Sequence, residues 1–214
     1  MATKPIQARA KRTREKLMTA LEALLKIKEF EHISIADIAK EAGVAVGSVY
    51  THFKDKEAFL SELLDNRMAL LEERLVIAEA NTGETLLKAA PDLRSAINVA
   101  VESAYLQVQT DAHIIRALHT QARLQAEHPD GKQMHLAKRA QSRATDLLRN
   151  YSDEIVHEDL EAAAQLMYYV LNIMFMEKAL FASTSEISGI RPEDEAIKRA
   201  TADMLYLYLT QIPK

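Results

Sequence analysis

The sequence predicts an all-α protein of about nine helices, with three or four short helices first and a larger helical bundle after them. The chain of 214 residues contains only five glycines and five prolines, whereas a sandwich or barrel needs many more turns. Apolar residues recur at spacings of three and four along nearly the whole chain, which is the period of a helix with one buried side. No segment shows the alternation of a confident strand.

The first four helices are expected from their caps. Residues 13–28 place an apolar stripe behind Thr13, which can cap the start of that helix. Ser34 and Asp37 form a capping box that opens a short helix, and Gly43 ends it. A second short helix is expected at about 46–52, and Asp55 opens a long helix.

The later helices follow the same rules. Residues 81–83 form a break, and Pro91-Asp92 starts a helix whose apolar stripe runs to Val108. A turn at 128–131 precedes a helix over about 132–150, and a strongly apolar helix covers 160–181. Residues 183–189 are expected to be a loop, and Pro192 suits the first position of the last helix.

Composition limits what the protein can be. The chain has no cysteine, which excludes a disulfide scaffold, thiol catalysis and cysteine-ligated zinc and fits a cytoplasmic protein. The most apolar run, Leu166–Met176, is 11 residues long, and a membrane span needs about 20. The basic N-terminus lacks the apolar stretch of a signal peptide.

Charge is distributed unevenly along the chain. Residues 1–56 contain 11 basic and 7 acidic side chains, a net charge of +4, whereas residues 57–214 contain 16 basic and 24 acidic side chains, a net charge of −8. This division indicates that the N-terminal end meets a polyanion. A solvated, frayed basic tail would give the same count, and charge alone does not separate the two.

The most specific pattern lies between Ile35 and Phe53. Two short amphipathic helices meet at Gly43, with the small Ala39 where they cross, as a helix-turn-helix requires. The second helix has a glycine in its interior, Gly47, and glycine costs about 1 kcal/mol relative to alanine there. Close approach of DNA would explain that cost. An ordinary two-helix corner is the alternative.

Together with their spacing, these residues resemble the DNA-binding domain of the TetR family of transcriptional regulators. The resemblance covers residues 9–60, and its specific parts are IADIA at 35–39, AGV at 42–44, GSVY at 47–50, HF at 52–53 and KDKE at 54–57. It implies that the helix from about Val46 to His52 enters the major groove. The remainder of the chain agrees with the family in length and helicity only.

The resemblance also implies roles for individual residues. The side chains implied to face the bases are Val46, Gly47 and Tyr50, and those implied to reach phosphates are Ser34, Ser48, Tyr50, His52 and Lys56. Lys56 is expected in the first turn of its helix, where backbone N–H groups add to anion binding. Two positions depart from the family: Ala45 replaces a capping residue, and Glu29 stands before Phe30 where glycine is usual.

The second part of the chain is expected to dimerise and to bind an effector. The helix at 166–181 is apolar nearly all round, so it and the last helix can form a four-helix interface with a second copy. Filling of one chain's own core is the alternative. The resemblance implies a ligand pocket, for which we select Tyr105, Asn172, Phe175 and Met176. No charged residue is expected inside an apolar stripe, which favours an apolar effector.

Enzyme functions find little support. The pairs Glu29/His32 and Glu154/His157 have the spacing of a di-iron ligand pair but lie at predicted helix ends. Phosphate-loop, zinc-protease and nucleophile-elbow motifs are absent from the sequence. No metal, cofactor or catalytic residue is therefore expected.

The sequence thus predicts a cytoplasmic, homodimeric, ligand-responsive repressor. Residues 1–56 would bind a palindromic double-stranded DNA operator, and residues 57–214 would dimerise and bind a small apolar effector that releases the operator. A helical small-molecule-binding protein or enzyme that only retains a helix-turn-helix corner is the alternative from another class.

Overall fold

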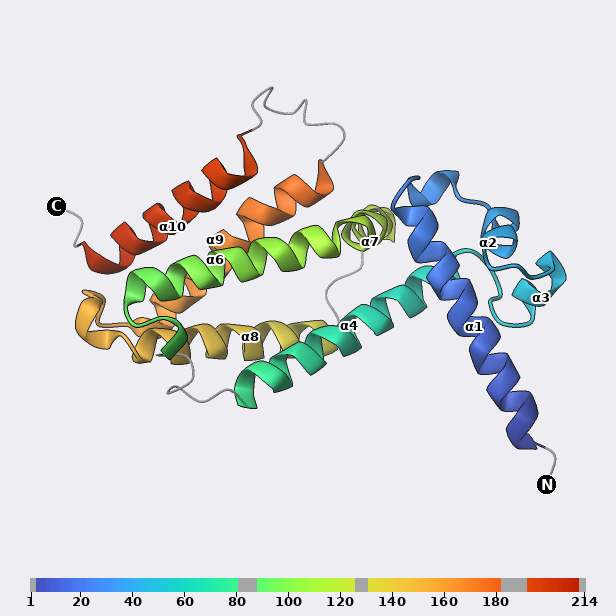
Figure 1. Cartoon of the computed structure of the whole chain (residues 1–214), viewed down its shortest axis with the longest axis horizontal. Coiled ribbons are helices and arrows are strands. Elements are labelled where there is room, and N and C mark those ends of the chain that lie inside the picture. The colour runs from blue at the N-terminus through green and yellow to red at the C-terminus, as the bar shows by residue number, and fades with distance from the viewer. Residues whose placement is uncertain (1–2, 81–87, 126–130, 182–191, 212–214) are drawn as a thin grey trace. The chain divides into compact units, whose positions relative to one another are not determined.

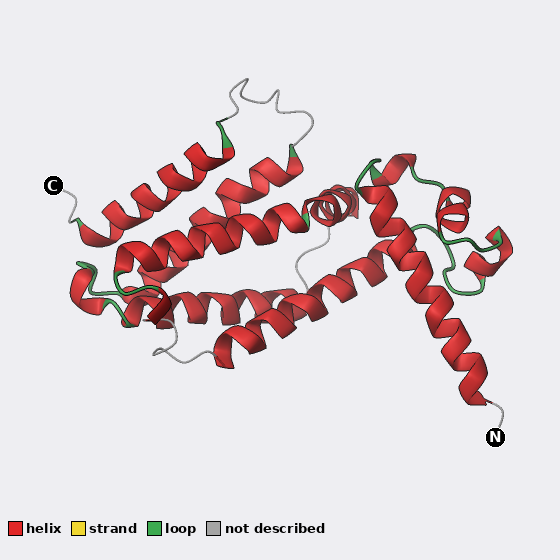
Figure 2. Ribbon diagram, in the orientation of Figure 1, coloured by secondary structure: helices red, strands yellow, loops and turns green. Residues whose placement is uncertain are grey.

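The protein is helical throughout the part that the structure describes. The computed structural model describes residues 3–80, 88–125, 131–181 and 192–211, which contain nine α-helices, two short 3₁₀ helices and no strand (Figure 2). The all-α prediction is confirmed. None of the described helices is both long and apolar enough to span a bilayer.

The chain divides into two compact units. The first contains residues 1–69 and 112–127, and the second contains residues 70–111 and 128–214. The predicted boundary after residue 56 concerns which segment binds DNA, and it stays a prediction.

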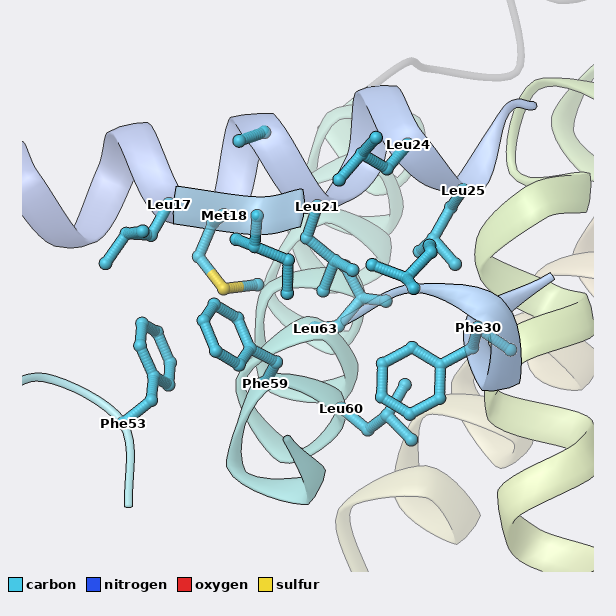
Figure 3. Close-up of a cluster of buried hydrophobic side chains, with 14 of the residues drawn as sticks. Leu17, Met18, Leu21, Leu24, Leu25, Phe30, Phe53, Phe59, Leu60 and Leu63 are labelled. Carbon is cyan, nitrogen blue, oxygen red and sulfur yellow. The ribbon is translucent and has the colours of Figure 1, made fainter. Parts of the chain in front are cut away.

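The first unit surrounds one apolar core. Its helices are α1 (Thr3–Leu25), α2 (Ile35–Glu41), α3 (Val46–Tyr50), the first half of α4 (Glu57–Ala80) and α7 (Ala112–Gln125) (Figure 1). Side chains of α1 pack against Phe30, Phe53 and the start of α4 in this core (Figure 3). The rings of Phe53 and Phe59 stack with centroids 3.7 Å apart. These contacts fix α2 and α3 on a rigid base.

Helix α1 begins ten residues earlier than predicted. Thr13 lies inside α1 and does not cap it, because its hydroxyl donates to the carbonyl of Arg9 at 3.0 Å, one turn back. The basic N-terminal segment is therefore helical, and the hypothesis of a frayed tail is wrong for residues 3–16. The long helix α4 begins at Glu57, and the carboxylate of Asp55 accepts the N–H of Ala58 at 2.9 Å.

The second unit is a bundle of α6 (Leu93–Thr110), α8 (Gly131–Arg149), α9 (Leu160–Leu180) and α10 (Asp194–Thr210). Helix α9 packs against the other three, and α6 packs against α10 (Figure 1). Asp92 and Asp159 cap α6 and α9 through the N–H groups of residues 95 and 162, at 2.7 and 3.0 Å.

One expectation for this unit is wrong, and one break was not predicted. Pro192 precedes the N-cap residue Glu193 and is not the first residue of α10. The helix that starts after Asp92 ends at Thr110, and Asp111 separates it from α7. That break carries neither glycine nor proline and was not predicted. The break at 81–83, the residues 128–130 of the predicted turn and the loop at 183–189 lie outside the described residues.

Candidate nucleic-acid interface

Helix α2 is held at its start by a complete capping box. The N–H of Asp37 donates to Ser34 Oγ at 3.1 Å, and the N–H of Ser34 donates to Asp37 Oδ2 at 2.9 Å. The hydroxyl of Ser34 also donates to Asp37 Oδ2 at 2.8 Å, and the two hydrogen bonds from Ser34 to the carboxylate lower the pKa of Asp37. Ser34 itself is exposed, so its place at the helix start is open to a phosphate.

The turn between α2 and α3 needs a glycine. Gly43 has a φ of 67°, in the left-handed region that favours glycine. The chain then returns to α2 through a hydrogen bond from the N–H of Val44 to the carbonyl of Ala39 at 2.9 Å. Ile38 and Ala39 are buried at the crossing. This is the packing that the sequence predicts for a helix-turn-helix.

Helix α3 has one buried face and one exposed face. Val49 is fully buried, whereas the exposed fractions of Val46 and Tyr50 are 42% and 57%. Gly47 is also exposed, and Ser48 and His52 are half-buried. Ala45 occupies the N-cap position without a side-chain hydrogen bond. The structure therefore brings the predicted base-reading residues Val46, Gly47 and Tyr50 onto the outer surface of α3.

Lys56 lies differently from the expectation. It precedes Glu57, the first residue of α4, and its carbonyl accepts the N–H of Phe59 at 3.2 Å. Its Nζ is 4.2 Å from the centroid of the Phe30 ring, and burial lowers the pKa of the ammonium. Lys56 is thus half-buried on an aromatic face, and its proposed contact with phosphate requires the ammonium to reach past that ring.

Arg14 is a structural residue that the sequence analysis missed. Its guanidinium forms an ion pair with Glu62 of α4, which raises the pKa of Arg14 through the hydrogen bond between them. It also lies 5.0 Å from the centroid of the Phe53 ring. Nearby, Glu29 faces Arg116 of α7 at 3.9 Å, so the residue that departs from the family pattern has a partner of its own.

In the second unit, two of the four predicted ligand residues lie together. The rings of Tyr105 and Phe175 meet edge to face, with centroids 5.4 Å apart and an interplanar angle of 85°. The Tyr105 hydroxyl donates to Asp194. Burial, reinforced by that carboxylate, raises the pKa of Tyr105 to about 12.

The other two ligand candidates differ. The amide of Asn172 donates to the carbonyl of Tyr168 at 2.8 Å, so a residue of its own helix already accepts one of its protons. Met176 is half-buried. The roles of all four residues in ligand binding stay predictions.

The expectation of purely apolar helix faces is wrong. Lys178 lies on the buried side of α9 with an exposed fraction of 7%. Its Nζ donates to the carbonyl of Pro192 at 3.0 Å and forms an ion pair with Asp194. The spacing of apolar residues did not predict the burial of Lys178, because this residue is near the end of α9, where a solvent-exposed lysine is common. This buried cation removes the reason for preferring an apolar effector.

The residues considered for metal binding have structural roles. Glu154 accepts the N–H of Leu93 at 3.0 Å, and Nε2 of His157 lies 2.6 Å from the carbonyl oxygen of Tyr208. Within the described ranges, no three histidine or acidic side chains gather in a way that could hold a metal ion.

Comparison with known proteins agrees with this geometry. Residues 17–63 match the family described as "Bacterial regulatory proteins, tetR family". An uncharacterised helix-turn-helix transcriptional regulator of Bacillus subtilis (strain 168), YxbF, is 26% identical over 142 residues, which cover 54% of this chain and 37% of that protein. The fatty acid metabolism regulator protein of the same organism is 34% identical over 68 residues, which cover 30% of this chain and 35% of that protein.

The fold extends beyond the matched segment. The crystal structure of a TetR-family transcriptional regulator from Mesorhizobium loti aligns over 93% of this chain and 96% of that chain, with a TM-score of 0.63 and 17% identity. The chain spans about a third of the length of the curated relatives it matches. Helix-turn-helix geometry and the family match over residues 17–63 together indicate a DNA-binding segment of the TetR type, and the chain shares its overall fold with solved TetR-family structures.

Proposed function

We propose that the protein is a repressor that binds a palindromic operator as a homodimer and is released by a small-molecule effector. The observation that carries the proposal is the division of α3, in which Val49 is fully buried while Val46 and Tyr50 are exposed. A rigid short helix with an exposed, aromatic outer face fits the major groove, which admits an α-helix. The boundary proposed for the DNA-binding segment is residue 56.

Apolar side chains on α9 and α10 support the homodimer. Leu166, Tyr169 and Ile173 follow one another at spacings of three and four on α9, with exposed fractions of 42%, 61% and 52%. On α10, Met204 and Leu207 are 55% and 48% exposed. Such a surface is costly in water and is typical of an interface. Two recognition helices would then read half-sites about 34–36 Å apart, or a multiple of that distance.

Effector binding is proposed for the second unit, with Tyr105, Asn172, Phe175 and Met176 as lining residues. An effector releases DNA only if it binds one arrangement of the dimer better than the other. Coupling of about 1–3 kcal/mol gives roughly a 5- to 150-fold loss of operator affinity.

DNA selection tests the function directly. The wild-type protein would be incubated with a random-sequence duplex library, and the enriched duplex, hereafter the selected duplex, would be sequenced and titrated. We expect a palindromic sequence that Tyr50→Ala no longer prefers over random DNA, while its melting temperature stays at the wild-type value because Tyr50 is exposed. Failure to enrich any sequence would refute the proposed function.

A further inference from the structure

The exposed surface of α1 is divided into two flanks of different charge. Arg9, Arg12 and Lys16 are spaced by three and four residues and therefore lie along one flank, hereafter the basic flank. About a quarter of a turn away, Lys11 faces Glu15 at 3.9 Å. Glu15, the acidic residue of this part of α1, therefore pairs with a lysine outside the basic flank, and it also borders the flank because it lies three residues from Arg12.

Burial does not hold this part of α1 in place. Among the side chains of α1 whose burial the structure describes, the first buried one is Leu17, and from Ala8 to Lys16 every side chain is exposed or half-buried. Figure 1 shows this end of α1 extending away from α2 and α3. Residues 8–16 contain five basic side chains and one acidic one. Residues 8–16 of α1 are therefore a charged helical segment whose side chains are accessible to solvent.

The charge on the basic flank opposes the stability of the helix itself. Like charges three or four residues apart repel one another on a helix surface, and Arg12 has Arg9 and Lys16 at those spacings. None of the three cations forms an ion pair with a residue that the structure describes, whereas Arg14 pairs with Glu62. A polyanion would offset this repulsion.

We propose that the basic flank of α1 binds the phosphate backbone of DNA beside the groove that α3 enters. The inference rests on the proposed function. Arg12 and Lys16 line a surface depression together with Glu15 of α1 and with Glu41 and Ala42 at the end of α2, and Gly43 and the turn to α3 follow directly. The flank is thus continuous with the helix-turn-helix surface. Arg9 is the cation of the flank that does not line the depression with these two carboxylates.

DNA fits this surface better than an anionic membrane does. A helix that binds a membrane surface needs a face of large apolar side chains opposite its basic face. Between Ala8 and Lys16 the only apolar residues are two alanines. The surface offers charge without an apolar face, which is what contact with a phosphate backbone requires.

The test removes two cations from the flank. Arg9→Gln/Arg12→Gln takes four cations from a dimer, and each lost phosphate contact should change the slope of log affinity against log salt by about 0.9. The slope should therefore become shallower by about 3 to 4. Affinity at 100 mM salt should fall roughly 10³- to 10⁴-fold, because a slope shallower by 3 to 4 amounts to as many decades between 1 M and 0.1 M salt. The loss should be the same for the selected duplex and for an unrelated duplex, because phosphate contacts carry no sequence information.

A matched control separates the flank from net charge. Lys26→Gln/Lys28→Gln removes the same number of charges from two exposed lysines just beyond the other end of α1, and it should leave the slope unchanged. Helix content and melting temperature of the arginine variant should equal or exceed those of the wild type, because repulsion is relieved.

Three outcomes would overturn the inference: an unchanged slope in the arginine variant, equal flattening in both variants, or wild-type binding to phosphatidylglycerol vesicles that the arginine variant loses while its DNA affinity is kept. In each, wild-type preference for the selected duplex would still hold and the proposed function would stand. Absence of that preference would instead refute the proposed function.

Discussion

Replacing Gly47 with alanine should make the protein more stable and a weaker DNA binder. Gly47 is the second residue of α3, and a Cβ built at this position meets nothing within 4 Å. The fold therefore has no steric need for glycine there. Alanine is favoured over glycine in a helix interior by about 0.5–1 kcal/mol, and this is the upper limit for the first turn of a helix. It corresponds to a rise of at most roughly 1–4 °C in melting temperature for a chain of this size.

The same methyl group should interfere with DNA. If DNA packs against Gly47 at van der Waals distance, an added methyl costs about 1–3 kcal/mol, or roughly a 5- to 150-fold loss of affinity. Thermal unfolding followed by circular dichroism at fixed protein concentration gives the first quantity. Fluorescence anisotropy with the selected duplex gives the second.

Gly43 provides the control, because its glycine is needed by the fold. Its φ of 67° costs an alanine about 1–2 kcal/mol, although a Cβ there also meets nothing within 4 Å. Gly43→Ala should therefore lower the melting temperature. Our reasoning about α3 fails if Gly47→Ala also lowers it, or if Gly47→Ala binds the selected duplex as tightly as the wild type.

Three further predictions concern the second unit. Asp194→Asn leaves the buried Lys178 ammonium without its carboxylate and should lower the free energy of unfolding in urea by about 1–3 kcal/mol, less than for a fully buried pair because Asp194 is half exposed. Lys178→Met removes the charge itself and should lower the free energy of unfolding by less. The reverse order of the two variants would contradict the ion-pair argument. Ile173→Glu places a charge on the exposed apolar face of α9 and should give folded monomers by light scattering, whereas an unchanged mass would exclude this face as the interface. Tyr105 has a pKa raised to about 12 from the usual value near 10, so its contribution to stability is present below pH 10 and is lost as the pH rises through 12. The free energy of unfolding should therefore fall less between pH 10 and pH 12 in Tyr105→Phe than in the wild type. Identical pH profiles of the two proteins would disprove the coupling.

Local signals explain why much of the fold could be predicted. The Ser34–Asp37 capping box, the Asp92 cap and the Gly43 turn involve residues no more than four apart, so the sequence contains both partners side by side. The start of α1 was mispredicted because the threonine hydroxyl satisfies the backbone equally well inside a helix as at its cap. Thr13 takes the interior option by donating to the carbonyl of Arg9.

Side chains whose partners are distant in sequence could not be placed in this way. The period of α3 predicts which of its residues are exposed, and the burial of Val49 beside the exposed Tyr50 follows it. Lys56, by contrast, lies on Phe30, and Lys178 pairs with Asp194 beyond the end of its helix. Neither contact has a spacing rule, because each depends on how separate elements pack.

The few hydrogen-bonding side chains on the outer face of α3 indicate that DNA affinity and base selection would come from different parts of the first unit. Ala45, Val46 and Gly47 offer no side-chain hydrogen bonds, so under the proposed function base recognition by this end of α3 would depend on apolar contact with thymine methyl groups and on DNA shape. Tyr50 adds one hydroxyl on the exposed face. So small a number of base-contacting side chains would supply little binding energy, and phosphate contacts would have to supply most of it. A cationic α1 beside a nearly apolar α3 is the combination that this division requires.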